Sequence, residues 1–405
     1  MTEHSHIMGG STAAQRINCP GSYLLEQQMP EKGSSEFADR GSMLHAAMEL
    51  ILLADPLNMK EAQPLFNDLE GQSLGFEGHE ITQELIADKL DPALRAWFEI
   101  DKKYHIKDIF IEQRVSLEVV IPGAFGTADI LGIDAKKRLH VLDWKFGDGV
   151  PVPVEGNLGA GFYAAATLYD SDEELKDFIA DMPDDNTLQV VLHIIQPRPH
   201  SGEEALQTWE TDGTWIEALI DQAVAAIEKA HKPGAPTKPG PWCRWCSAKP
   251  ICPAHKELAS EALGKAPESM TAVDLSDAMH KADLLKAWVI AVYDLALQEM
   301  EGGAAVPGYK LVEKRATRQW VDAPEAEAIL KKSKVKVDDM YKKTLMSPTQ
   351  IEKKHAKLYN KKLTDLVEKK SSGVTIAPDS DKRPAVTGSM QLLANALPEN
   401  SKQET

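Results

Sequence analysis

Two aspartates and a lysine are the residues of this sequence whose types and spacing most clearly suggest chemistry. Asp143 and Lys145 lie two positions apart in an apolar run, so on a β-strand their side chains point to the same face. Asp129 ends the segment GTAD in a preceding run that also predicts a strand. An antiparallel neighbour would bring its carboxylate beside the other two groups. Carboxylates bind Mg2+ or Mn2+, which polarises a phosphodiester and activates water, and an ammonium group can orient that water.

A solvated ion pair on an exposed strand is the alternative explanation, because Asp-x-Lys is a short pattern. The neighbours argue against it, since Asp143 and Lys145 lie within the segment VLDWKFG. Unpaired charges among apolar residues are costly in free energy. We therefore take Asp129, Asp143 and Lys145 as candidate catalytic residues.

The four cysteines form a second candidate site. Cys243, Cys246 and Cys252 follow a C-x2-C-x5-C pattern, and the only other cysteine is Cys19 in the segment NCPGS. Thiolates bind zinc and iron–sulfur clusters. A structural zinc site more often has two C-x-x-C pairs, so the one-plus-three arrangement favours a 4Fe–4S cluster that joins the N-terminus to the end of the same domain. Zinc and four independent buried thiols are the alternatives.

The composition is that of a globular protein, with 405 residues, 43% of them hydrophobic and 26% charged. This length predicts two or three domains. No apolar run is long enough to span a bilayer, so we expect no membrane association. The first ten residues lack a basic segment followed by an apolar stretch, so we expect no secretory signal and a cytoplasmic location. Disulfides are disfavoured there.

The charge is distributed unevenly. The chain has 45 Lys and Arg against 62 Asp and Glu, a net charge of −17, which by itself argues against binding to nucleic acid. Residues 331–372, however, contain 13 Lys against five acidic residues, which gives +8 for this segment and −25 for the rest. The segment predicts short helices with a Lys-rich face. That face is either a solvated surface or a surface that contacts phosphates.

The elements that must position these residues follow from the hydrophobic pattern. Residues 35–54 and 80–101 predict helices, and the region 106–146 predicts three strands in a meander. The pattern then predicts a helix, a buried strand and an amphipathic helix, at residues 161–169, 188–196 and 214–230. This order predicts an α/β fold. Further along, we expect a long helix over 274–301 and a hairpin or strand over 309–320.

Four motifs together resemble a known nuclease family. They are GSMLH at 41–45, GTAD at 126–129, DWK at 143–145 and the four-cysteine frame. Their order resembles the RecB-type branch of the PD-(D/E)XK nucleases, in particular its iron–sulfur members, which include AddB-type and CRISPR-associated exonucleases. The layout also resembles a phage-encoded group of such proteins found in recombination modules. The resemblance covers about residues 11–260 and implies a restriction-endonuclease-like core.

The resemblance implies a role for each matching residue. Asp129 and Asp143 would bind the catalytic Mg2+ or Mn2+, with the carbonyl of Trp144 as a further ligand. Lys145 would be the catalytic lysine, and His45 would lie near or on the metal, although a helix histidine is more commonly a core residue. The implied reaction is in-line attack of metal-bound water on a phosphodiester. The four cysteines would bind the cluster, which would be structural because hydrolysis needs no electrons.

The helix after the third strand departs from the family pattern. The family has Gln-x-x-x-Tyr there; Tyr163 matches the tyrosine, but Gly159 stands at the glutamine position. Tyr163 is a candidate catalytic residue or a plain core residue. Gly159 suggests reduced or altered activity. Glu112 on the first strand could add a ligand, but we expect an exposed strand carboxylate there.

These observations predict a metal-dependent deoxyribonuclease, an exonuclease acting on linear double-stranded or single-stranded DNA ends. The resemblance suggests phage recombination or end resection, with a strand-annealing or single-strand-binding protein as partner. The expected domains are a PD-(D/E)XK domain over 1–262, a mainly helical, partly Lys-rich extension over 263–372 and a loosely ordered tail over 373–405. The alternative is a catalytically weak or inactive iron–sulfur protein that binds DNA or acts as a scaffold.

Overall fold

The structure is a computed structural model of the whole chain. It describes residues 5–30, 35–147, 152–183, 187–197, 205–262, 271–314, 317–341, 345–370, 374–378 and 384–386, and the statements below concern these. The chain divides into two compact units, Met1–Leu285 and Lys286–Thr405. Each unit is described by itself.

The first unit has a mixed α/β fold. Its elements are α1 (Gly10–Asn18), α2 (Ser22–Glu26), α3 (Glu36–Leu53), α4 (Met59–Leu69), α5 (Gln83–Leu85), η1 (Ile86–Leu90), α6 (Asp91–Tyr104), β1 (Lys107–Ser116), β2 (Phe125–Ile133), β3 (Leu139–Trp144), α7 (Leu158–Tyr169), α8 (Glu173–Ile179), β4 (Gln189–Ile195), β5 (Leu206–Asp212), α9 (Gly213–Ala230), η2 (Pro241–Arg244), η3 (Lys249–Ile251) and α10 (Pro253–Ala262). The helix α11 (Ala272–Glu301) follows, and the division between the units falls within it.

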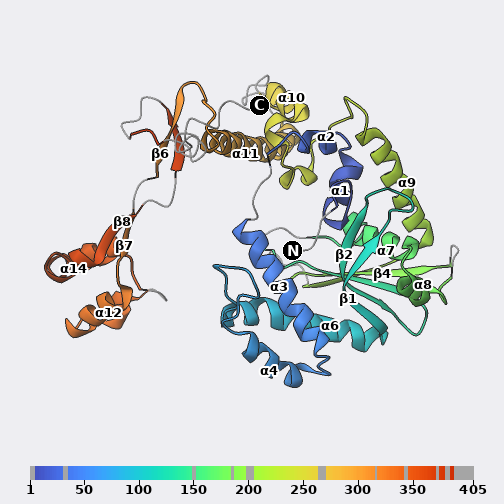
Figure 1. Cartoon of the computed structure of the whole chain (residues 1–405), viewed down its shortest axis with the longest axis horizontal. Coiled ribbons are helices and arrows are strands. Elements are labelled where there is room, and N and C mark those ends of the chain that lie inside the picture. The colour runs from blue at the N-terminus through green and yellow to red at the C-terminus, as the bar shows by residue number, and fades with distance from the viewer. Residues whose placement is uncertain are drawn as a thin grey trace, which may run out of the picture. The chain divides into compact units, whose positions relative to one another are not determined.

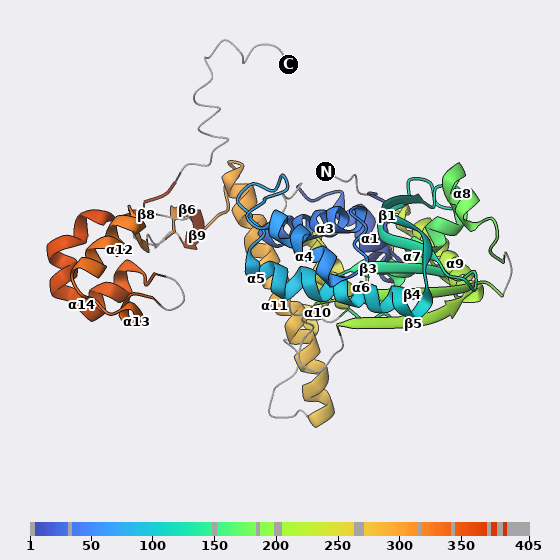
Figure 2. The same ribbon diagram turned by 90° about the horizontal axis from the view of Figure 1, so that it is seen from below.

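The centre of the first unit is one five-stranded sheet in the order β1-β2-β3-β4-β5. Strands β3 and β4 are parallel, because α7 and α8 connect them, and the other neighbours are antiparallel. Figure 1 and Figure 2 show helices on both sides of the sheet, with α3, α4 and α6 on one face and α1, α7 and α9 on the other. The predicted α/β class is therefore confirmed.

Strand alternation divides the apolar residues between the two faces. Val141 and Leu192 belong to the core shared with α7 and α9, whereas Leu142 and Trp144 belong to the core shared with α3 and α6. Both faces of the central strands are thus buried. A charged side chain on these strands can reach solvent only near a strand end or beside a gap between helices.

The predicted elements agree with the structure over most of the first unit. The expected helix at 35–54 is α3, the meander is β1 to β3, and the later helices and strand are α7, β4 and α9. Strand β5 was missed, since its sequence LQTWETD is mostly polar and lies at the edge of the sheet. Helix α4 was also missed, and it contains Pro64, a residue that usually signals the end of a helix.

The second unit consists of a two-stranded ribbon and a helical head. Its elements are β6 (Tyr309–Glu313), β7 (Thr317–Trp320), α12 (Ala323–Lys332), α13 (Val337–Met340), α14 (Pro348–Lys362), η5 (Thr364–Leu366), β8 (Val367–Lys370) and β9 (Val374–Pro378). β6 pairs with β9 and β7 pairs with β8, and both pairs are antiparallel. The helices between β7 and β8 enclose a small core that includes Leu330, Ile351 and Tyr359.

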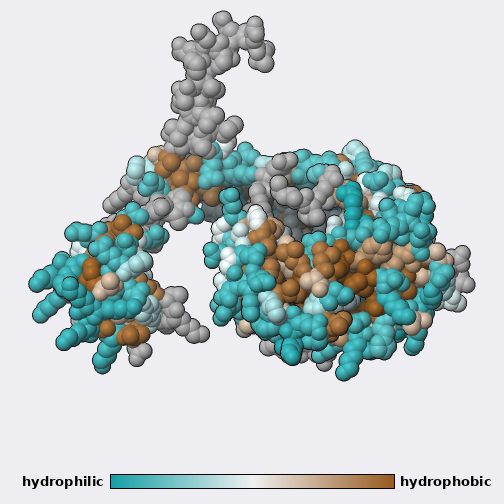
Figure 3. Space-filling model, turned by 60° about the horizontal axis from the view of Figure 1, so that its bottom comes forward, coloured by the Kyte–Doolittle hydropathy of each residue, from teal (hydrophilic) through white to brown (hydrophobic). Residues whose placement is uncertain are grey.

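Strands β6 and β7 lie in the region 309–320, where a hairpin or strand is expected, but they pair with β9 and β8 and not with each other. The helices expected in the Lys-rich segment are present, but strands lie on both sides of them, and residues 374–378 of the expected loose tail form β9. The rest of that tail lies outside the described residues, apart from 384–386. In Figure 3 the surface of the helical head is mainly hydrophilic. Among the described residues, no helix is long and apolar enough to cross a membrane.

Candidate active site and cysteine pocket

Three neighbouring strands each place one carboxylate at the same level of the sheet. The register that pairs Ile130 with both β1 and β3 puts its neighbour Asp129 between Glu112 and Asp143. Asp129 and Asp143 are buried, with 6% and 4% of their surface exposed, and the side chain of Glu112 is 21% exposed. We call these three residues the carboxylate row. The predicted proximity of Asp129 to the Asp-x-Lys strand is thus present in the structure.

His45 completes a group of metal-ligand type. Ser35 caps α3, its hydroxyl accepting a hydrogen bond from the amide of Ala38, and the helix places His45 Nδ1 3.2 Å from Asp129 Oδ1 and 3.6 Å from Glu112 Oε1. The ligand atoms of His45, Glu112 and Asp129 all lie within 4.8 Å of one another. No other set of three His, Cys, Asp or Glu side chains in the described ranges is this close. These distances suit a divalent cation.

Glu112 lies in the site, although the sequence favours an exposed strand carboxylate at this position. Its backbone has φ of 50°, inside strand β1, a left-handed conformation that costs a residue with a side chain on the order of 1–3 kcal/mol. The pairing of β1 with β2 stays in register on both sides of Glu112, so this residue lies opposite Asp129. The carboxylate lies beside His45 and Asp129 instead of in solvent.

The backbone after β3 fixes the remaining groups. The amide of Trp144 donates a hydrogen bond of 2.5 Å to Asp129 Oδ2, which leaves Asp129 Oδ1 facing His45. The amide of Lys145 donates to the carbonyl of Ile195 and so extends the pairing of β3 with β4. Lys145 Nζ lies 2.6 Å from Asp143 Oδ2. A ligand role for the Trp144 carbonyl stays a prediction.

The pKa values of the site residues are shifted by burial and by the three neighbouring carboxylates. Burial lowers the pKa of His45, but Asp129 and Glu112 outweigh it and raise that pKa to about 10. Burial raises the pKa of Asp143, and Asp129 adds to this while Lys145 opposes it. Burial also lowers the pKa of Lys145, but the contact with Asp143 outweighs it, so the net pKa is raised. His45 and Lys145 therefore partly neutralise the row, a role that a bound cation would share.

Tyr163 lies on α7 near the same site. Burial raises its pKa well above the ordinary value, and the charges of Asp143, Asp129 and Glu112 add to the effect. The ring also packs against Gly126, where an added Cβ would lie 3.0 Å from it. Tyr163 therefore has both features that the sequence left as alternatives, a core contact and proximity to the carboxylates.

Glycine at position 159 fits a close approach between two helices. A Cβ on Gly159 would lie 2.7 Å from the carbonyl oxygen of Gly10, in the first turn of α1. Gly10 is itself pressed against Tyr163, since its own Cβ would lie 2.2 Å from the tyrosine ring. Helix α1 thus occupies the space beside α7 that a side chain at position 159 would need. This close approach of α1 to α7 explains why position 159 has no side chain.

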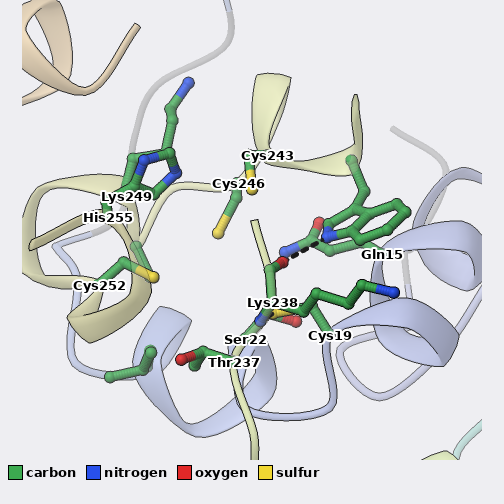
Figure 4. A pocket seen from close by; sticks show the side chains of 13 residues that line it. Gln15, Cys19, Ser22, Thr237, Lys238, Cys243, Cys246, Lys249, Cys252 and His255 are labelled. Carbon is green, nitrogen blue, oxygen red and sulfur yellow. Dashed lines mark hydrogen bonds between the residues drawn. The ribbon is translucent and has the colours of Figure 1, made fainter. Parts of the chain in front are cut away.

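The four cysteines line one cavity. Figure 4 shows the sulfur atoms of Cys19, Cys243, Cys246 and Cys252 around a common space. Cys19 follows α1, whereas the other three lie on the loop that contains η2 and η3. Residues separated by more than two hundred positions in the chain are therefore brought together, as the spacing predicted.

Backbone amides face two of the four cysteine sulfur atoms. The amide of Lys238 points at Cys19 Sγ at 3.4 Å, and that of Gly240 points at Cys243 Sγ at 3.3 Å. Burial raises the pKa of Cys246 to about 12, with the charge of Glu26 adding to the effect. Such thiols stay protonated unless a metal displaces the proton. The donor set fits a thiolate-bound metal group.

Protein contacts also tie the two chain segments together around the cavity. Glu26 Oε2 accepts a 2.7 Å hydrogen bond from Arg16 Nη1, and its Oε1 accepts one of 2.9 Å from the amide of Ser247, next to Cys246. The amide of Gly21 donates to the carbonyl of Pro236. The ends of the domain therefore meet through hydrogen bonds as well as through the cysteines.

The comparison with protein families gives one match. The family described as "Protein of unknown function (DUF2800)" has a model that matches residues 4–384. The chain belongs to this family. The match covers the sheet, the cysteine pocket and most of the second unit, so a single family model includes all of these parts.

Proposed function

We propose that this member of the DUF2800 family is a metal-dependent DNA exonuclease. The observation that supports it most is the carboxylate row on three adjacent strands, with His45 on one side and Lys145 at the end of β3. Two or more carboxylates beside one ammonium group are the set that phosphodiester hydrolysis with Mg2+ or Mn2+ requires. We also propose that the core is of the restriction-endonuclease-like PD-(D/E)XK type, in agreement with a mixed five-stranded sheet between helices.

Each residue has a distinct task in the proposed reaction. His45, Glu112 and Asp129 would hold the cation, with Asp143 beside them. A bound Mg2+ or Mn2+ supplies polarisation of the phosphodiester and lowers the pKa of water. Lys145, whose side chain is 37% exposed while Asp143 is only 6% exposed, can reach a substrate oxygen or a water molecule and still contact Asp143.

We propose a 4Fe–4S cluster in the cysteine pocket. Zinc with four thiolates needs sulfur atoms only about 3.8 Å apart, as follows from the Zn–S bond length. In the described residues no three of the cysteine sulfurs lie within 4.8 Å of one another. A cubane binds each thiolate at a separate iron atom and so suits wider spacing. The cluster would hold the two ends of the domain together.

The helical head of the second unit supports DNA as the substrate. Its acidic side chains are largely used within the head: Glu327 pairs with Lys331, Glu352 with Arg318, and Asp339 with Lys354. Exposed lysines remain that form no ion pair in the described part of the chain, namely Lys332, Lys334, Lys336, Lys357, Lys361 and Lys362. A surface of this kind attracts the phosphate backbone in spite of the acidic body.

The biological setting rests on the family resemblance alone. A cytoplasmic nuclease of a phage recombination module would resect DNA ends and pass the exposed strand to a strand-annealing or single-strand-binding protein.

An assay with end-labelled DNA tests the proposed activity. Wild type and Lys145→Ala would be incubated with linear, nicked and single-stranded DNA in Mg2+ or Mn2+, with the label at the 5′ or the 3′ end to report polarity. Lys137→Ala serves as the matched control, since Lys137 forms an exposed ion pair with Asp181. We expect cleavage by wild type and Lys137→Ala and a loss of about 100-fold or more in Lys145→Ala. Equal activity in all three would contradict the assignment of Lys145.

A further inference from the structure

His255 is a buried histidine without a partner. Only 1% of its surface is exposed, and neither ring nitrogen has a hydrogen-bond partner among the described residues. Buried polar atoms are nearly always paired, so an unpaired imidazole indicates a ligand that the protein alone does not provide. A neutral imidazole offers one N–H donor and one acceptor.

The ring faces the cysteine cavity. His255 is one of the residues that line this cavity, together with all four cysteines. Figure 4 shows it on the Cys252 side of the space. The side chain is therefore aimed at the place where a group bound by the cysteines would lie.

The local helix geometry explains this position. The amide of Lys256 donates to the carbonyl of Cys252, so Cys252 directly precedes α10 and Pro253 is its first residue. His255 is then the third residue of the helix. A side chain at that position reaches back toward the residue before the helix, as in a capping box. The sequence C-P-A-H thus places the imidazole and the thiol of Cys252 in the wall of the same cavity.

The four cysteines differ in the hydrogen-bond donors that face their sulfur atoms. Cys19 and Cys243 each have a backbone amide directed at sulfur. No hydrogen bond to Cys252 Sγ is present among the described residues, and Cys252 is the least buried of the four thiols. A donor on the Cys252 side of the cavity would supply a hydrogen bond to this sulfur as well. N–H groups directed at sulfur raise the reduction potential of an iron–sulfur cluster, because they stabilise its added negative charge.

We propose that His255 donates one ring N–H to the sulfur shell of the cluster on the Cys252 side. The residue is a positioning and tuning group and not a ligand, because the cysteines already provide four thiolates. This inference rests on the proposed 4Fe–4S cluster. It adds a fifth side chain to the site, one that no cysteine pattern in the sequence could indicate.

The test compares three full-length proteins purified without oxygen. His255→Leu removes both nitrogens, and His255→Gln keeps an amide donor. His231→Leu is the control, because His231 is exposed, contacts the Ile227 carbonyl and does not line the cavity. Iron and sulfide per chain, the midpoint potential and the rate of cluster loss in air would be measured for each and for wild type.

We expect all variants to keep their iron and sulfide. His255→Leu should have a more negative midpoint potential and lose its cluster several-fold faster in air, and His255→Gln should recover most of both properties. His231→Leu should match wild type. Unchanged potential and lifetime in His255→Leu would overturn the inference, and so would loss of one iron per cluster, which would make His255 a ligand. Colourless wild type with one zinc per chain would instead overturn the proposed cluster itself.

Discussion

The carboxylate row and the cysteine pocket are both sites of metal-ligand type, but the fold builds them in opposite ways. The row lies on adjacent strands whose register and hydrogen bonds are complete without a metal. The pocket joins chain segments from the two ends of the domain, and its four thiols face one common cavity. The carboxylate row should therefore determine activity, and the cysteine pocket should determine stability. The predictions below test that separation.

The largest expected effect is on activity and arises in the carboxylate row. Asp143→Asn should lower the cleavage rate by more than about 100-fold, because it removes a charge needed beside the cation. Its melting temperature should change little, since loss of the contact with Lys145 is offset by relief of the repulsion from Asp129 and of the cost of burying a charge. Cleavage rate and thermal unfolding measured on the same preparation would check both statements.

The matched control is a buried aspartate outside the row. Asp134 is 3% exposed and accepts a hydrogen bond of 2.7 Å from Arg138 Nε. Asp134→Asn should lose about 2 kcal/mol of stability while it cleaves DNA normally at 25 °C. A reversed pattern in the two variants would break the proposed separation.

The largest effect on stability is expected in the cysteine pocket. Cys246→Ala should lose the visible absorption of the cluster and on the order of 3 kcal/mol of stability, so that the melting temperature falls by roughly 6–12 °C. Activity below the melting temperature should fall much less than in Asp143→Asn. Differential scanning calorimetry with iron analysis would check this, and an unchanged melting temperature would refute a structural role.

Glu112 should affect metal affinity without a cost in stability. Glu112→Gly should weaken Mn2+ binding by about 10–100-fold and relieve a backbone strain of about 1 kcal/mol. Asp108→Gly is the control, since Asp108 has φ of 48° on the same strand but lies outside the row. Titration calorimetry should find normal Mn2+ affinity in Asp108→Gly. Normal affinity in Glu112→Gly would remove Glu112 from the site.

The pH dependence of metal binding should follow His45. A ligating imidazole must be neutral, whereas His45 without metal is protonated up to its pKa of about 10. Binding of Mn2+ therefore displaces a proton, and the affinity should rise about tenfold per pH unit between pH 7 and 9. His45→Gln should flatten this slope. Calorimetry in buffers of different ionisation enthalpy would count the released protons, and a count near zero would exclude His45 as a ligand.

The smallest effect is expected outside both sites, in the helical head. Replacement of Lys357, Lys361 and Lys362 by Ala should weaken DNA binding in EDTA and reduce the slope of log affinity against log salt by up to about 0.9 per lysine. A double variant of Lys331 and Lys354, which are paired with Glu327 and Asp339, should change the slope less. Equal slopes in both variants and wild type would exclude the head as a phosphate-binding surface.

The sequence predicted the parts of the site that follow local patterns. Period-two alternation placed Asp143 and Lys145 on one face, and the meander brought Asp129 to them. Glu112 joins the site through its position opposite Asp129, and this pairing register of β1 with β2 does not follow from the spacing within β1 alone. The packing of Gly10 against Gly159 is a contact between distant segments. Propensity and spacing contain no information about such contacts.

Metal-dependent cleavage by the full-length wild type is the most direct test of the central claim. Linear duplex DNA labelled at one end would be incubated with anaerobically purified protein in Mg2+ or Mn2+, with Asp143→Ala prepared in parallel to detect contaminating nucleases. Wild type should release nucleotides progressively in the presence of metal and release none in EDTA, and Asp143→Ala should reach at most about one hundredth of the wild-type rate. Wild type with an intact cluster that leaves the DNA whole, or cleavage at equal rates by both proteins, would contradict the central claim.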